Sequence, residues 1–76
     1  MEAMIKISEL FPELTPRQAE VCALLVKGYS HKEIGHELHL SVRTVEDHVQ
    51  EILSRSKSYD TRRLIYNALG APEVQA

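Results

Sequence analysis

The sequence predicts an all-α fold built from four short helices. Four stretches of the chain each begin with a residue type that caps helix N-termini: Thr15, Ser30, Ser41 and Asp60. Behind each cap, apolar residues recur at helical spacing. No stretch alternates apolar and polar residues as a half-buried strand would, and no repeat or low-complexity tract competes with this interpretation.

The first predicted helix follows the segment Thr15-Pro16-Arg17-Gln18. This segment combines a capping threonine, a proline at the first helical position and a glutamine that can bond back to the cap. Val21, Leu24 and Leu25 then form an apolar stripe. Gly28 is expected to end the helix as a left-handed cap.

The second predicted helix starts at a similar capping box, Ser30-His31-Lys32-Glu33, and turns Ile34 and Leu38 inward. Gly35 lies inside this helix, where glycine costs about 1 kcal/mol relative to alanine. We therefore expect Gly35 to permit the close approach of another helix. A tight break at His39-Leu40 leaves about three residues before the next helix, and so short a link forces a sharp angle, as in a helix-turn-helix unit.

The third and fourth predicted helices follow Ser41 and Asp60. The third spans about 42–55, with its inward face formed by Val45, Val49, Ile52 and Leu53. The apolar residues of the fourth are Leu64, Ile65, Ala68 and Leu69, and Gly70 follows them. The predicted organisation is an N-terminal arm over 1–13 with one turn at 7–11, a four-helix domain over 14–70 and a tail over 71–76.

Composition places the chain among small globular domains. Its 76 residues are 43% hydrophobic and 26% charged, which argues against disorder. Cys22 is the single cysteine, which excludes a disulfide framework and a cysteine-based zinc site and fits a reduced, cytoplasmic location. The apolar runs are too short to cross a membrane, and the N-terminus does not resemble a secretion signal.

The net charge of −2 limits how the chain could bind nucleic acid. Residues 14–70 carry eight Lys/Arg and seven Asp/Glu, and the surplus acids lie outside this range. Any nucleic-acid contact would therefore come from a few placed cations and not from a dense basic patch.

Metal binding and catalysis find little support in the sequence. His31, His36 and His39 do not share one helical face and have no carboxylate partner at a familiar spacing, so we expect no metal and no cofactor. Cys22 lies beside an apolar stripe and is interpreted as a small buried hydrophobe. The chain has no acid–base constellation, so an enzyme is not expected.

Residues 14–53 closely resemble the DNA-binding domain of LuxR-type transcription regulators, which also occurs in FixJ- and NarL-type response regulators and in GerE. With the fourth helix the resemblance covers about 14–70. The residues that carry it are Leu14-Thr15-Pro16-Arg17, Glu20-Val21, Gly28, Ser30, Lys32-Glu33-Ile34, Leu38, Ser41, Thr44-Val45 and His48. The resemblance implies a bacterial regulator, either stand-alone or an excised C-terminal domain, that is located in the cytoplasm and associates with the nucleoid when bound.

Three departures from the family pattern stand out. Ser56-Lys57 replaces the usual Leu-Gly after the third helix, so we expect the following turn to differ. Glu46 stands where the family often has lysine, and Gln50 where some members have another lysine. These changes predict weaker or differently tuned recognition.

The resemblance implies that residues 42–55 form a recognition helix in the major groove of duplex DNA. Arginine can bind guanine bidentately, glutamine can bind adenine and a carboxylate can accept from cytosine. The expected base contacts are Arg43, Glu46, Asp47 and Gln50. The expected contacts to the DNA backbone are Ser30, His31, Lys32, Ser41, Thr44 and His48.

The fourth helix is expected to mediate a homodimer. Arg62, Arg63, Tyr66 and Asn67 flank its apolar stripe, and the expected interface residues are Leu64, Tyr66 and Asn67, with Leu64 also turned inward. RNA polymerase is a further expected partner. A second hypothesis, motivated by the near-neutral polar face, is a protein-interaction module of the same fold that pairs with another regulator and has little DNA affinity.

Overall fold

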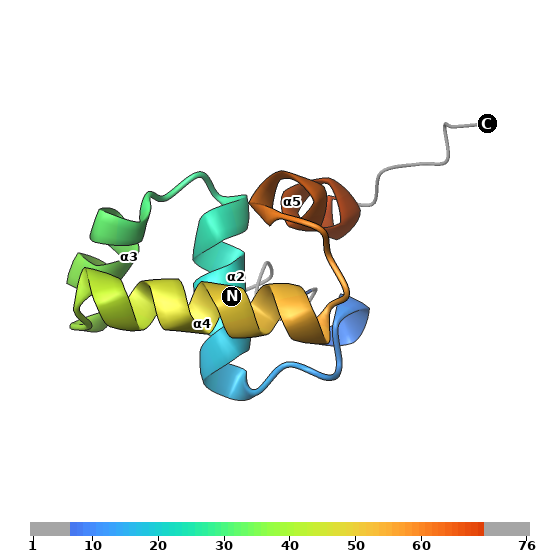
Figure 1. Cartoon of the computed structure of the whole chain (residues 1–76), viewed down its shortest axis with the longest axis horizontal. Helices are drawn as coiled ribbons and strands as arrows, with labels where there is room; N and C mark the ends of the chain where they lie inside the picture. The colour runs from blue at the N-terminus through green and yellow to red at the C-terminus, as the bar shows by residue number, and fades with distance from the viewer. Residues whose placement is uncertain (1–6, 70–76) are drawn as a thin grey trace.

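The computed structural model describes residues 7–69, and every regular element in that range is helical (Figure 1). The four helices are α2 (Pro16–Val26), α3 (His31–Leu38), α4 (Val42–Arg55) and α5 (Thr61–Ala68). A helical stretch over 7–10 precedes them, and the Phe11 N–H donates to the Ile7 carbonyl at 2.8 Å. The predicted all-α class and the predicted turn at 7–11 are confirmed.

Each of these four helices begins at its predicted cap. Thr15 and Ser30 form complete capping boxes with Gln18 and Glu33, in which each partner accepts the other's backbone N–H. Ser41 and Asp60 accept from the third N–H of α4 and of α5. Because the caps satisfy N–H groups that a helix cannot bond internally, the capping residues fix where each helix starts.

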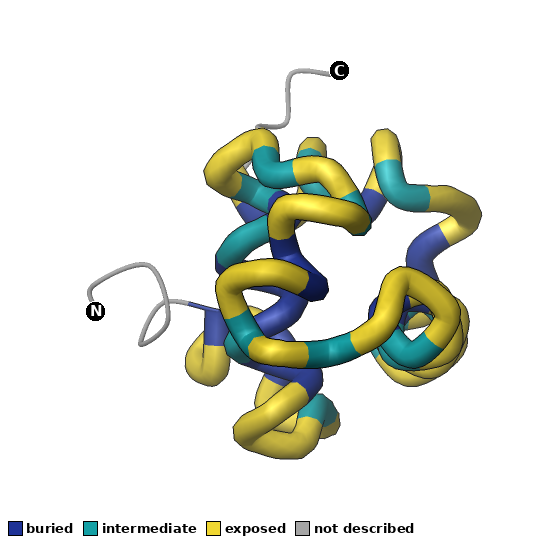
Figure 2. The backbone as a smooth tube through the Cα atoms, turned by 90° about the vertical axis from the view of Figure 1, so that its left-hand side faces the viewer, coloured by how far each residue is buried: buried dark blue, intermediate teal, exposed yellow. Residues whose placement is uncertain are grey.

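The helices enclose one apolar core, and the buried backbone segments face one another across it (Figure 2). Its fully buried members include Val21 from α2, Ile34 from α3, Val45 from α4 and Leu64 from α5. Leu24, Leu38 and Leu53 pack on it while staying half-buried. Leu69, predicted as part of the apolar stripe, is 64% exposed, because the helix ends at Ala68 before that residue turns inward.

The N-terminal segment belongs to the same core. Ile7 is 3% and Phe11 is 8% exposed, and both pack in the cluster formed by the four helices. Part of the predicted N-terminal arm, at Ile7 and Phe11, therefore packs together with the four helices. Residues 1–6 of that arm and the tail over 71–76 lie outside the described residues.

The end of α2 confirms the predicted role of Gly28. Its φ is 98°, its N–H donates to Leu25 at 2.9 Å, and the N–H of Tyr29 donates to Leu24 at 3.0 Å. This pair of bonds is the Schellman motif, which needs a left-handed residue after the helix.

The end of α4 forms the same motif without glycine. Lys57 has φ 57°, its N–H donates to Ser54 at 3.2 Å, and the N–H of Ser58 donates to Leu53 at 2.9 Å. The Ser56 hydroxyl donates to the Ile52 carbonyl at 2.7 Å. Lys57 adopts the left-handed conformation that glycine would adopt at lower cost, so the motif forms here although Ser56-Lys57 stands at this position.

Gly35 permits a close approach, as predicted, but its neighbour is a turn and not a helix. A Cβ atom at Gly35 would lie 2.6 Å from the carbonyl oxygen of Leu40. The N–H of Leu40 in turn donates to the Gly35 carbonyl at 2.8 Å, and His39 is left-handed with φ 60°. The missing side chain therefore lets the chain fold back tightly between α3 and α4.

Candidate nucleic-acid interface

α4 has one face that is buried in the core and an opposite face that is polar and exposed. It packs against α2, α3 and α5 and runs across α2, with α3 beside its N-terminal end (Figure 1). Val45, Val49 and Ile52 are buried beneath it, at 0%, 2% and 0% exposure. The four predicted base-contact residues are all exposed on the other side: Arg43, Glu46, Asp47 and Gln50.

Two of these four residues form an ion pair. Arg43 Nε lies 3.5 Å from Asp47 Oδ1, one helical turn along α4. Their side chains are 82% and 70% exposed, so water screens the pair and its contribution to stability is small. The guanidinium can therefore exchange Asp47 for another acceptor at little cost.

The starts of α3 and α4 present the predicted backbone contacts. Ser41 Oγ accepts the Thr44 N–H at 3.1 Å and donates to Thr44 Oγ1 at 3.0 Å, so the hydroxyl is committed to the cap. The N–H groups ahead of Thr44 have no acceptor within the helix and remain available to an anion. Ser30, Lys32 and Ser41 are exposed, whereas His31, Thr44 and His48 are half-buried.

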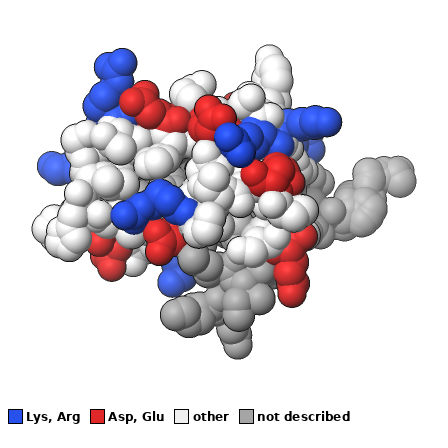
Figure 3. All heavy atoms as spheres, turned by 90° about the horizontal axis from the view of Figure 1, so that it is seen from below, with Lys and Arg blue, Asp and Glu red and all other residues white. Residues whose placement is uncertain are grey.

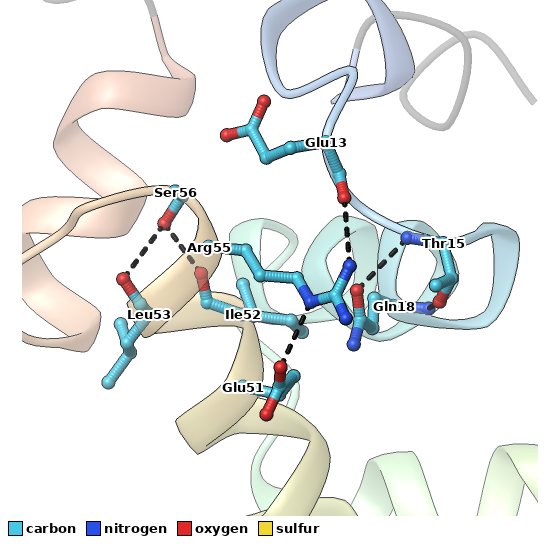
Figure 4. A network of polar contacts seen from close by, with 8 residues as sticks. All are labelled: Glu13, Thr15, Gln18, Glu51, Ile52, Leu53, Arg55 and Ser56. Atoms are coloured by element: carbon cyan, nitrogen blue, oxygen red, sulfur yellow. Dashed lines mark hydrogen bonds and ion pairs between the residues drawn. The ribbon is translucent and has the colours of Figure 1, made fainter.

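Arg55 fastens the other end of α4. Its Nε lies 3.0 Å from Glu51 and its Nη1 donates to the Glu13 carbonyl at 3.4 Å, across the gap to the segment before α2 (Figure 4). Close beside it, the Thr15–Gln18 capping box starts α2. Arg55 thus links the C-terminal end of α4 to the segment before α2, a role that the sequence pattern did not indicate.

Val42 and Tyr59 are exposed and were not predicted as site residues. Val42, at the first position of α4, is 41% exposed beside Arg43. Tyr59, in the turn before α5, is 90% exposed. A large apolar side chain directly after a cap, and a tyrosine among turn residues, are the only sequence signals for them.

The three predicted interface residues of α5 occupy different environments. Leu64 is 0% exposed and packs in the chain's own core, so it offers no surface to a second chain. Tyr66 is 46% exposed, and Asn67 is exposed as well. The Arg63 guanidinium lies 5.2 Å from the centre of the Tyr66 ring, a cation–π distance.

The remaining candidate groups are placed apart from any site. Cys22 is 0% exposed, as predicted, and burial raises the pKa of its thiol to about 11. Within residues 7–69, no three His, Cys, Asp or Glu side chains gather where they could hold a metal ion. In the same range, no helix has the length and apolar character needed to cross a membrane.

Opposite charges are interspersed over the surface. On the face shown in Figure 3, Lys and Arg side chains stand beside Asp and Glu side chains, and no large area of one sign appears. Arg17–Glu20 and Arg55–Glu51 are two such pairs, at 3.1 and 3.0 Å. The prediction that contacts to nucleic acid depend on single placed cations fits this distribution.

The geometry defines a helix-turn-helix domain, and comparison with known proteins places it in a family. Residues 12–65 match the sequence model of the bacterial regulatory proteins of the luxR family. The chain belongs to this family, so it is a DNA-binding domain of the kind that regulates transcription and not an enzyme. The resemblance drawn from residues 14–53 is confirmed.

Individual relatives are response regulators. The chain is 42% identical over 64 residues to the response regulator protein VraR of Staphylococcus aureus strain Mu3 and, equally, to that of Staphylococcus epidermidis strain RP62A. The match covers 83% of this chain and 31% of each relative, so the chain spans about a third of their length. No solved structure matches it at a significant level.

Proposed function

We propose that the domain binds duplex DNA sequence-specifically, with α4 as the recognition helix in the major groove. The observation that carries the proposal is the exposed row of Arg43, Glu46, Asp47 and Gln50 on a helix whose opposite side is buried in the core. A helix held in this way can enter the groove with its N-terminal half leading. The DNA-binding unit is proposed to span residues 14–70.

Within this unit, Arg43 is the main base reader. It binds guanine through its guanidinium once the bond to Asp47 is exchanged, and Gln50 binds adenine. Glu46 and Asp47 accept from cytosine or repel phosphate, which lowers affinity for other sequences. The exposed methyl groups of Val42 contact a thymine methyl.

Phosphate contacts position the helix in the groove. Lys32 supplies the one full positive charge among the proposed contacts at the start of α3. The free N–H groups at the starts of α3 and α4 supply further donors. The proposed set is Ser30, His31, Lys32, Ser41, Thr44 and His48.

The proposed assembly is a homodimer through the exposed side of α5, at Tyr66 and Asn67. Two copies would read half-sites related by two-fold symmetry, because a single small module buries too little surface for tight specific binding. RNA polymerase is proposed as a further partner, and the bacterial nucleoid as the place of action.

A second candidate function is a protein-interaction module of the same fold. The ion pair of Arg43 with Asp47 and the interspersed surface charges favour it, because both reduce attraction to DNA.

Selection of bound sites from random duplex DNA, followed by a salt titration, tests the proposed function. DNA binding predicts an enriched motif and an affinity that falls linearly in log–log form with salt. The absence of both, with the chain folded by circular dichroism, would favour the interaction module.

A further inference from the structure

One flank of α4 carries both proposed phosphate contacts and an acid. A helix places residues that are three or four apart in one row along its axis. Such a row in α4 consists of Thr44, His48, Glu51 and Arg55. Thr44 and His48 are proposed to contact the DNA backbone, and Glu51 follows His48 about 4.5 Å further along the axis. A DNA strand beside His48 therefore comes close to the Glu51 carboxylate.

A free carboxylate at this place would oppose DNA binding. Like charges repel one another most strongly within the Debye length, which is about 8 Å at physiological ionic strength. Glu46 and Asp47 already place two acids on the neighbouring polar face of α4. The affinity for DNA therefore depends on whether the charge of Glu51, a third acid of the same helix, is neutralised.

Arg55 neutralises Glu51 and fixes its position. Arg55 Nε lies 3.0 Å from Glu51 Oε2, and Arg55 Nη1 donates to the Glu13 carbonyl at 3.4 Å. The guanidinium thus lies between the Glu51 carboxylate and the segment before α2 (Figure 4). This segment is itself fixed, because the Leu14 N–H donates to the carbonyl of the buried Phe11 at 3.1 Å.

The ion pair of Arg55 is closer and less exposed than that of Arg43. Arg43 lies 3.5 Å from Asp47, and its side chain is 82% exposed. Arg55 lies 3.0 Å from Glu51, its side chain is 43% exposed, and the Glu13 carbonyl is a second partner. When DNA approaches, Arg43 can exchange its carboxylate for a base, whereas Arg55 stays with Glu51.

We propose that Arg55 is a positioning residue for DNA binding. It does not contact DNA but keeps the Glu51 carboxylate in an ion pair, so that the carboxylate does not repel the phosphates beside Thr44 and His48. This inference rests on the proposed function, since it requires α4 in the groove. It gives a role in binding to two residues outside the proposed set of DNA contacts.

A double-mutant cycle on a duplex selected by the wild type tests the proposal. Arg55→Gln should weaken binding about three- to fivefold, because it releases the carboxylate. Glu51→Gln should change the affinity by less than about twofold, because Arg55 already neutralises this acid. In the Glu51→Gln background, Arg55→Gln should then also change the affinity by less than about twofold.

Three outcomes would overturn the proposal. An equal loss from Arg55→Gln in both backgrounds would mean that Arg55 contacts phosphate itself, acts by its charge alone or positions α4 through Glu13, since the bond to Glu13 is lost in both. A gain from Glu51→Gln as large as the loss from Arg55→Gln would mean that the two charges act independently. No loss from Arg55→Gln in the wild-type background would remove the effect altogether.

Two control variants separate positioning from charge and from stability. Arg55→Lys keeps the charge and an ion pair one turn from Glu51, so it should retain the affinity within about twofold. Arg17→Gln removes the same charge from a comparable ion pair on α2, at 3.1 Å from Glu20, and should also retain the affinity within about twofold. An affinity that follows the urea midpoint of each variant, and not the charge of Glu51, would contradict the positioning role.

Arg43→Ala distinguishes failure of this inference from failure of the proposed function. If the wild type binds neither selected nor random duplex, the proposed function fails and this inference fails with it. If Arg43→Ala weakens binding to the selected duplex while Arg55→Gln acts equally in both backgrounds, the reading role of α4 stands and only the role of Arg55 is overturned.

Discussion

Arg43 and Asp47 form an exposed ion pair across one turn of α4, on the face that we propose to read DNA. In a DNA groove the two side chains would have opposite effects, since the guanidinium attracts phosphate and bases while the carboxylate repels phosphate. Breaking the pair costs little because both side chains are largely in water. Selectivity for a DNA sequence can therefore come from the acceptor group that takes the place of the Asp47 carboxylate beside the guanidinium.

Arg43→Ala should reduce affinity for the selected site by about 1–3 kcal/mol and relax one position of the motif. Asp47→Asn should raise affinity for random duplex, because a repulsion is removed and Arg43 is released. Binding isotherms on selected and random duplexes measure both effects. If neither substitution changes duplex binding, α4 is not a reading surface; loss of cytosine specificity in Asp47→Asn would instead make Asp47 a base reader.

Within residues 7–69, Lys57 and His39 are the non-glycine residues with a left-handed backbone. A left-handed conformation costs a non-glycine residue about 1–2 kcal/mol, and Lys57 adopts it with φ 57°. Lys57→Gly should therefore raise the free energy of unfolding by about 1 kcal/mol. Urea unfolding followed by circular dichroism measures the change.

Lys27→Gly is the matched control for that substitution. Lys27 also ends a helix but is right-handed, with φ −76°, so glycine relieves no strain there and should not stabilise. Equal stabilisation by both substitutions would show that conformational strain at Lys57 is not the cause.

At the scale of elements, the angle between α3 and α4 depends on the space at Gly35. Gly35→Ala would gain helix propensity of about 1 kcal/mol. It would also place a Cβ 2.6 Å from the Leu40 carbonyl oxygen, a backbone atom that cannot move without the turn. We expect net destabilisation of about 1–3 kcal/mol, measured by urea unfolding. Glu37→Ala, exposed on the same helix, should change stability little; an unchanged or raised stability of Gly35→Ala would contradict the packing argument.

The start of α3 makes a second prediction at this scale. Lys32 is proposed to contact phosphate, so Lys32→Ala should weaken duplex binding about equally across sequences. The slope of log affinity against log salt should fall by about one unit. Titrations on selected and random duplexes measure it, and a loss confined to the selected site would exclude the phosphate role.

At the scale of the whole molecule, α5 carries both a residue of the folded core and an exposed residue of the proposed dimer contact. Leu64 is fully buried and Tyr66 is 46% exposed on the same helix. Tyr66→Ala should leave the thermal midpoint nearly unchanged and reduce cooperative binding to a duplex with two half-sites. Leu64→Ala, the contrasting core substitution, should cost about 2–5 kcal/mol of stability. Unfolding of Tyr66→Ala would place the tyrosine among the packing residues and remove the main support for the dimer.

The sequence by itself determined the helices and the family. Each of the four caps, at Thr15, Ser30, Ser41 and Asp60, bonds an N–H three residues away, so a local pattern sufficed to predict it. The apolar spacing likewise predicted the buried face of α4, because a helix repeats its faces at a fixed period.

Tertiary structure alone decided the contacts between segments distant in sequence. The partner of Gly35 is a turn carbonyl, Ile7 and Phe11 complete the core, and Arg55 reaches Glu13 across the fold. Leu69 stays exposed although its spacing placed it on the apolar stripe of α5. These outcomes depend on how helices pack and where each one ends, and the energies of packing arise between elements, where a pattern local to one helix carries no information.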